Sequence, residues 1–99
     1  MAYKIKKTKE FLKNVVAIVE YLEKKWGMRS AQKFQAILDT KLEMLSSDLI
    51  GGAETVKNKG IRKLSITTHN KVYYKIVKDE IIILTLFENK MNPERNRYE

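Results

Sequence analysis

The spacing of hydrophobic residues changes along the chain, and this change constrains the fold more than any other feature. In the first half, apolar residues recur every three or four positions, as on one face of a helix: Phe11, Val15, Ile18, Leu22, Trp26, then Ala31, Phe34, Leu38, Leu42, Leu45. In the last third, β-branched and aromatic residues form short runs that mostly alternate with polar residues. The chain therefore combines a helical part with a sheet part.

Two helices are predicted, joined by a tight connection. Thr8 offers a side-chain oxygen to begin the first helix, and Gly27 ends it where a left-handed cap is usual. Leu12, Val16 and Val19 widen the apolar stripe, and we expect Trp26 and Phe34 to be core residues. Because few residues separate the two stripes, the helices must form an antiparallel hairpin. The second helix closes at 46–48, and Gly51-Gly52 open an irregular loop running to about Gly60.

The sheet is predicted from one short run before the helices and three runs after them. Residues 3–6 suit an edge or inserted strand, and the later runs are centred on 64–66, 72–77 and 81–87. Short polar turns join the last three into an antiparallel meander. The run 81–87 is apolar on both sides and should be central or covered on both faces. The predicted fold is α+β, in the order β-α-α-β-β-β, with the antiparallel helix hairpin packed on one face of a small, mainly antiparallel sheet.

Size and composition exclude several classes of protein. Ninety-nine residues form one domain, 1–99, because two cores would each be too small. The chain has no Cys and one His, which excludes disulfides, thiolate nucleophiles and multi-histidine metal clusters, so we expect no metal and no cofactor. The longest apolar run, 81–84, is too short to span a membrane, and no apolar stretch follows the basic residues of 1–7 as in a secretory signal. We expect a cytoplasmic protein without a membrane partner.

Positive charge is concentrated in one stretch. The net charge is +8, and residues 55–78 contain seven basic residues and no acid: Lys57, Lys59, Arg62, Lys63, Lys71, Lys75 and Lys78. Seven of the eight net charges therefore lie there. A localised positive field attracts a polyanion or an acidic protein, although it also keeps ordinary proteins soluble.

The sheet face away from the helices is the candidate functional surface. Arg62, Tyr73, Lys75 and Thr85 are its predicted members, and Arg62 is placed at the mouth of its strand. Basic groups beside aromatic rings suit a phosphate backbone with a stacked base, or equally a partner segment. His69 stands in a predicted hairpin turn with no assignable orienting partner, so a turn residue is the favoured interpretation.

The order of motifs resembles the RelE/ParE superfamily of bacterial toxins from toxin–antitoxin pairs. The resemblance is carried by Trp26-Gly27, Ala31-x-x-Phe34 and the leucines of the second helix, by residues 60–66, by His69, 73–76 and 81–87, and by the tail 88–94. It implies two helices against a small curved sheet, in agreement with the fold predicted above.

The resemblance implies two functional branches. RelE-like members are ribosome-dependent messenger-RNA endonucleases that use Arg, Lys and a C-terminal Tyr or a His, whereas ParE-like members inhibit DNA gyrase. Arg62 matches an arginine of both branches, and Lys57 and Lys59 match the loop lysines of RelE-like enzymes loosely. Lys90 replaces a motif arginine, which weakens a bidentate phosphate contact, and Tyr98 lacks the RelE-like context. These departures favour the ParE-like branch.

The resemblance therefore predicts a growth-inhibiting, plasmid-stabilisation-like toxin that blocks an essential target, DNA gyrase and replication, and is neutralised by a cognate antitoxin. The target contacts expected are Arg62, Tyr73, Lys75, Lys90 and Arg95. One alternative is a metal-independent endoribonuclease acting on translated messenger RNA at the ribosome through Arg62, Lys57, Lys59 and His69; another is a degenerate, non-toxic module that only binds antitoxin. An acidic and hydrophobic antitoxin tail would wrap the helices and add a strand, and operator DNA would be bound only through the antitoxin.

Overall fold

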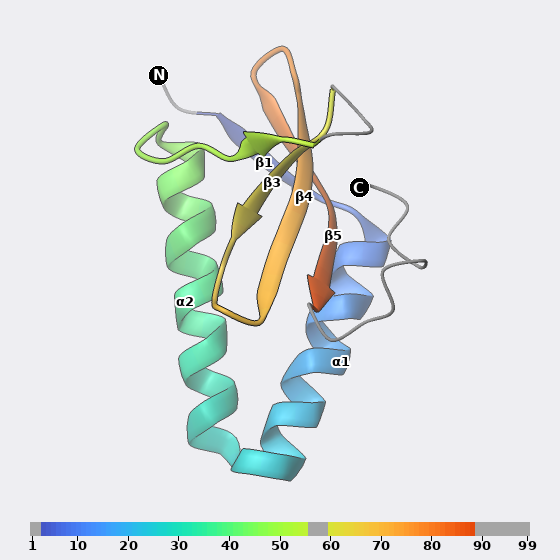
Figure 1. Cartoon of the computed structure of the whole chain (residues 1–99), viewed down its shortest axis with the longest axis vertical. Coiled ribbons are helices and arrows are strands. Elements are labelled where there is room, and N and C mark those ends of the chain that lie inside the picture. Colours follow the sequence, from blue (N-terminus) through green and yellow to red (C-terminus); the bar gives the residue numbers. More distant parts are fainter. Residues whose placement is uncertain (1–2, 56–59, 89–99) are drawn as a thin grey trace.

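The computed structural model describes residues 3–55 and 60–88. The described elements follow the predicted order with one strand added: β1 (Lys4–Lys7), α1 (Lys9–Trp26), α2 (Met28–Ser46), β2 (Ala53–Glu54), β3 (Arg62–Ser65), β4 (Asn70–Val77) and β5 (Glu80–Glu88). The two helices pack side by side as a hairpin, and the sheet lies against them (Figure 1). The predicted α+β architecture is confirmed.

One glycine separates the two helices. Gly27 has φ 95° and donates its N–H to the Glu23 carbonyl oxygen at 3.0 Å, which ends α1, and α2 begins at the next residue. Its ψ of 168° is extended, so the predicted left-handed cap is wrong in detail. The positive φ still favours glycine at this position, because a Cβ disfavours that backbone conformation.

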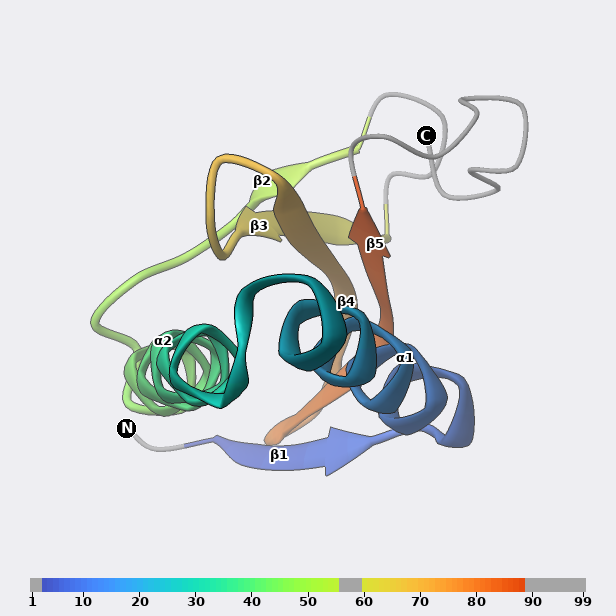
Figure 2. The ribbon, with the colours of Figure 1, turned by 90° about the horizontal axis from the view of Figure 1, so that it is seen from below.

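The sheet has the strand order β1-β5-β4-β3-β2. β1 is the predicted edge strand and runs parallel to β5, while the other pairings are antiparallel. β5 is paired on both sides, as its two apolar faces indicated. β2 corrects the predicted irregular loop: Ala53 and Glu54 pair with Lys63 and Arg62, a strand too short for any alternation to appear in the sequence. Figure 2 shows the twisted sheet passing from β1 on one side of the helices to β2 and β3 on the other.

The core lies between the helices and one face of the sheet. The helices contribute Phe11, Ile18, Phe34, Leu38, Leu42 and Leu45, and the strands contribute Val72, Tyr74, Ile81, Ile83 and Leu86. For three residues the prediction of a buried side chain is wrong: Trp26 is 65% exposed, Leu12 48% and Val16 55%. Trp26 ends α1 at the tip of the helix hairpin, which extends past the sheet (Figure 1), and nothing there buries the ring.

Candidate functional site

The two faces of the sheet carry different side chains. Cross-strand partners point to the same side, so the buried Val72 and Tyr74 define the helix side and Tyr73 the opposite side. We call this opposite side the outer sheet face; by register its members are Lys4, Lys6, Lys63, Ser65, Lys71, Tyr73, Lys75, Val77, Glu80, Ile82, Thr85 and Phe87.

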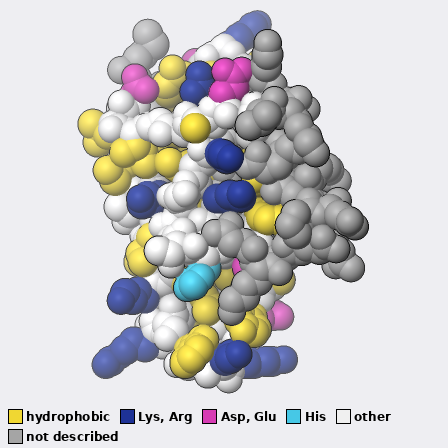
Figure 3. Space-filling model, viewed as in Figure 1, with side chains coloured by type: hydrophobic (Ala, Val, Ile, Leu, Met, Phe, Trp, Pro, Cys, Tyr) yellow, Lys and Arg dark blue, Asp and Glu magenta, His cyan; other side chains and the backbone are white. Residues whose placement is uncertain are grey.

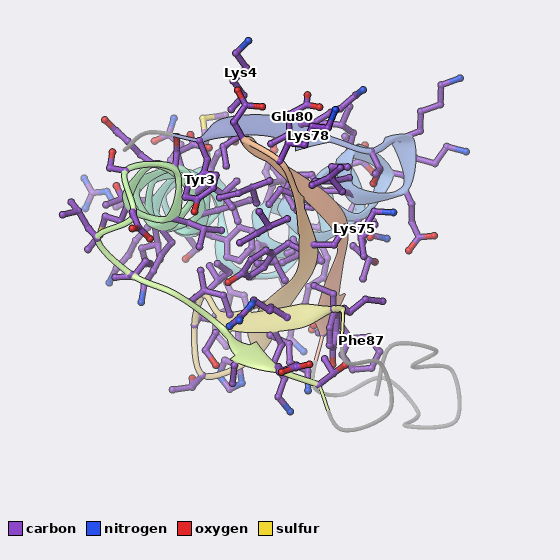
Figure 4. All side chains as sticks on the ribbon, turned by 90° about the horizontal axis from the view of Figure 1, so that it is seen from above. Tyr3, Lys4, Lys75, Lys78, Glu80 and Phe87 are labelled. Carbon is purple, nitrogen blue, oxygen red and sulfur yellow. The ribbon has the colours of Figure 1, made fainter. Side chains whose placement is uncertain are left out.

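The outer sheet face is basic, as predicted. Among the described strand residues, Glu80 is its only carboxylate, and it pairs in register with Lys4. Lys6, Ile82 and Lys75 form one row across β1, β5 and β4, which sets the two lysines about 10 Å apart at two strand spacings. Lys4, Lys6 and Lys75 are all exposed. Figure 4 labels Lys4 on β1 and Lys75 on β4. Three neighbouring cations on one face form a local positive field that attracts a polyanion or an acidic surface.

Tyr73 corrects the prediction of an exposed ring on this face. Its side chain is fully buried and packs edge-on against Phe87, with ring centroids 6.3 Å apart. The Lys71 ammonium lies 5.6 Å from the centroid of each ring. Thr85 is also buried and donates its hydroxyl to Asn14 Oδ1 of α1 at 2.6 Å. The rings therefore stabilise the sheet and offer no free stacking surface.

Arg62 does not join the lysines of the outer sheet face. It opens β3 at the strand mouth, as predicted, but its register partner is Tyr74, which places it on the helix side. Its guanidinium donates to the Gly52 carbonyl oxygen at 3.0 Å, and the Gly52 N–H donates to the Tyr74 hydroxyl at 2.7 Å. Arg62 thus holds the segment after α2 against the sheet, and Arg62 and Lys75 face opposite sides.

His69 lies in the turn between β3 and β4, as predicted, and its backbone N–H donates to the Thr67 hydroxyl at 3.1 Å. Arg62 begins β3, while His69 follows the end of that strand at Ser65, so β3 holds them at least about 10 Å apart. The structure does not bring these two candidate catalytic residues together.

The remaining predicted site residues are not part of this geometry. Lys57, Lys59, Lys90, Arg95 and Tyr98 lie outside the described residues. Across 3–55 and 60–88, no group of three or more His, Asp and Glu side chains is placed to hold a metal ion.

A groove between the helix hairpin and the β3–β4 turn was missed from the sequence. Its volume is about 380 Å³, and its wall includes the apolar Ile18, Leu22, Phe34 and Ile37 together with Tyr21, Lys25, Trp26, Ser30, Lys33, Thr67, His69, Asn70 and Glu88. The Lys25 ammonium lies 5.6 Å from the Tyr21 ring and 5.9 Å from the Trp26 ring. Figure 3 shows hydrophobic and basic side chains around the histidine on this side of the molecule. The sequence signal was a tryptophan at a helix end, which we interpreted as core.

Several solved structures with a similar fold come from toxin–antitoxin systems. A chain of the chromosomal ParDE toxin–antitoxin system of P. aeruginosa matches with a TM-score of 0.75 and 18% identity, covering 88% of this chain and 96% of that one. A chain of the E. coli DinJ-YafQ toxin–antitoxin complex matches with a TM-score of 0.64 and 12% identity, covering 89% of this chain and 93% of that one. The YoeB dimer of Staphylococcus aureus matches with a TM-score of 0.60 and 13% identity, covering 86% of this chain and 94% of that one. At these identities the likeness establishes the fold.

The sequence itself identifies the family. The family described as the ParE toxin of the type II toxin-antitoxin system, parDE, matches residues 5–93. The chain therefore belongs to the ParE toxin family, within the superfamily that the resemblance indicated. No curated protein matches. In the described part of the chain, neither helix has the length and apolar character needed to cross a membrane.

Proposed function

We propose that this chain is a growth-inhibiting toxin that acts on DNA gyrase and is neutralised by a cognate antitoxin. The ParE family match over residues 5–93 is the observation that carries the proposal. The separation of Arg62 and His69 by the length of β3 counts against the RelE-like alternative, because an acid–base pair must converge on one reacting group.

The exposed lysines of the outer sheet face are the proposed target contact. Lys4, Lys6 and Lys75 face solvent, and Glu80 is the one carboxylate that the described strands add to this face. The DNA of a gyrase–DNA complex offers a polyanion to such a face, and the contact should weaken as salt rises. Lys90 and Arg95 stay in the proposal as further contacts.

The groove is the proposed antitoxin site. Its apolar wall residues Ile18, Leu22 and Ile37 suit large hydrophobic side chains, while Lys25 and Lys33 at its edge suit carboxylates. An amphipathic, acidic segment that folds as it binds satisfies both demands. The lining residues lie on the helices, the β3–β4 turn and the end of β5. Lys6 and Lys75 do not line the groove, so a segment bound within it does not contact them there.

The first experiment is induced expression in cells with and without the neighbouring gene of the operon. We expect growth arrest that the neighbouring product relieves, inhibition of supercoiling by purified gyrase, and intact messenger RNA. Cuts inside translated codons, mapped from transcript ends, would instead establish the endoribonuclease. Harmless expression of folded wild-type protein that still binds the neighbouring gene's product would favour the non-toxic antitoxin-binding module.

A matched pair of variants tests the target face. Lys6→Glu/Lys75→Glu reverses two exposed charges on the outer sheet face, and Lys24→Glu/Arg29→Glu makes the same change of net charge near the helix-hairpin tip. We expect only the first pair to abolish gyrase inhibition, with circular dichroism unchanged in both. An equal loss of gyrase inhibition in both double variants would show that only net charge matters and that the outer sheet face does not contact the target.

A further inference from the structure

One side of α1 contacts neither the sheet nor the groove. We call it the α1 outer face: Lys9, Leu12, Lys13, Val16, Glu20 and Glu23. Their spacings of mostly three and four residues place them on one side of the helix. All six are exposed, and Leu12 and Val16 expose about half of their surface at its centre. None of the six lines the groove.

The charges of this face are ordered along the helix. Both lysines lie in the N-terminal half and both glutamates lie in the C-terminal half; Val16 stands between the two pairs, and Leu12 lies between the lysines. This order opposes the helix dipole, which favours anions at the N-terminus and cations at the C-terminus. It also sets Lys9 beside Lys13 and Glu20 beside Glu23, each a like-charge pair one turn apart. Elsewhere α1 follows the dipole, with Glu10 in its first turn and Lys24 and Lys25 in its last.

Little within the described protein compensates this arrangement. Lys9, Lys13, Glu20 and Glu23 make no ion pair with any described residue. An i,i+4 relation to Lys24 supports Glu20 and an i,i+3 relation to Glu10 supports Lys13, each by only a few tenths of a kcal/mol. The stability of the helix therefore does not account for the order of charges.

We propose that the α1 outer face binds a second copy of this chain, with the two α1 helices antiparallel about a two-fold axis at Val16. In that arrangement Lys9 faces the partner's Glu23, and Lys13 faces the partner's Glu20. Val16 of one copy meets Val16 of the other at the two-fold axis, and Leu12 of each copy lies one turn away. The same surface serves both copies, as a two-fold interface requires, and every charge gains an opposite partner.

The size of the face sets the strength of the dimer. α1 has 18 residues, so the helix pair is about 27 Å long. One helix face buries less than the roughly 1,000 Å² typical of stable interfaces. The dimer is therefore weak and dependent on concentration and salt. This inference goes beyond the proposed function and does not rest on it.

The test is sedimentation equilibrium of the full-length chain, made by cell-free synthesis, from micromolar to millimolar concentration. We expect reversible dimerisation that weakens as salt rises. Lys9→Glu/Lys13→Glu places like charges opposite one another and should weaken dimerisation about tenfold or more. The fourfold exchange Lys9→Glu/Lys13→Glu/Glu20→Lys/Glu23→Lys restores opposite charges and should restore the dimer. Its charges follow the helix dipole, so the fold is not at risk.

Two controls keep the result specific. A mixture of the wild type with the fourfold variant should form each homodimer but no heterodimer by native mass spectrometry, because lysines would then face lysines. Val16→Ser should weaken dimerisation, whereas Leu49→Ser, at a residue 72% exposed and outside α1, should not. A wild type that stays monomeric at millimolar concentration, or a dimer indifferent to these exchanges, would overturn the inference.

Discussion

Of the described glycines, Gly52 is the one at which an added Cβ has no room. Its N–H and its carbonyl oxygen are both used, by the Tyr74 hydroxyl and the Arg62 guanidinium. A Cβ built on it would lie 2.3 Å from the Lys63 carbonyl oxygen and 2.8 Å from the Tyr74 hydroxyl. The close approach of two backbones therefore requires glycine, although φ is not positive there.

We expect Gly52→Ala to lower the free energy of unfolding by about 1–3 kcal/mol, since backbone must move to admit the methyl group. Gly51→Ala is the matched control, because no atom lies within 4 Å of its added Cβ, and it should change stability by less than about 0.5 kcal/mol. Urea denaturation measures both. Equal stability of the two variants would contradict the geometry.

Leu38 tests the core at the same scale. It is buried between the helices and the sheet, so Leu38→Ala should lower the free energy of unfolding by about 2–5 kcal/mol through lost burial and a residual cavity. Leu49→Ala makes the same truncation at an exposed site and should have little effect. Similar midpoints of urea denaturation for the two variants would place Leu38 outside the core.

At the scale of the element, the junction of β1 and α1 connects the helix hairpin to the sheet. The Thr8 side-chain oxygen accepts the Phe11 N–H at 3.1 Å and so caps α1. The same hydroxyl donates to the carbonyl oxygens of Ile83 and Leu84 at 2.9 Å each. Leu84 has no register partner on β4, because the pairing shifts there. A helix cap thus also satisfies the carbonyl groups of a bulged strand.

We expect Thr8→Ala to lower the free energy of unfolding by about 1–2 kcal/mol, near the upper end for a cap, because the Leu84 carbonyl also loses the hydroxyl donor, while the Ile83 carbonyl keeps the Thr8 N–H at 3.2 Å. Thr8→Ser keeps the hydroxyl and should retain most of the stability. Thermal unfolding followed by circular dichroism measures both. An alanine variant as stable as the serine variant would show that water replaces the hydroxyl without cost.

At the scale of the whole molecule, the proposed contacts occupy separate surfaces of one small scaffold. The lysines belong to β1 and β4, the groove belongs mainly to the helices, and the α1 outer face points away from the core. Each surface can therefore be changed without altering the others, because the free-energy effects of mutations add when the mutated sites share no partner.

Trp26 tests this independence. Because the ring is 65% exposed, Trp26→Ala should leave the free energy of unfolding nearly unchanged but weaken antitoxin binding about tenfold or more, as for an aromatic anchor. Titration calorimetry measures the affinity, and gyrase inhibition by the variant should persist. Unchanged affinity would remove Trp26 from the antitoxin site.

Much of the fold was predictable because hydrophobic period is a local property of the chain. The helices, the edge position of β1, the paired position of β5 and the turn at His69 follow from the spacing of neighbouring residues. Trp26 was predicted wrongly because periodicity shows which side of a helix is apolar and not how far the sheet extends along it. The groove was missed because it joins α1 to the β3–β4 turn, residues far apart in the chain.

By itself the sequence determined the α+β class, the order of elements, the excess of positive charge and the resemblance to ParE-like toxins. Only the tertiary structure decided which basic groups share a face. Register placed Lys6 and Lys75 in one row on the outer sheet face and turned Arg62 to the other side, where Gly52 accepts its hydrogen bond. The physical reason is the two-residue period of a strand: a shift of one position reverses the side of every residue, and pairing with distant strands sets that position.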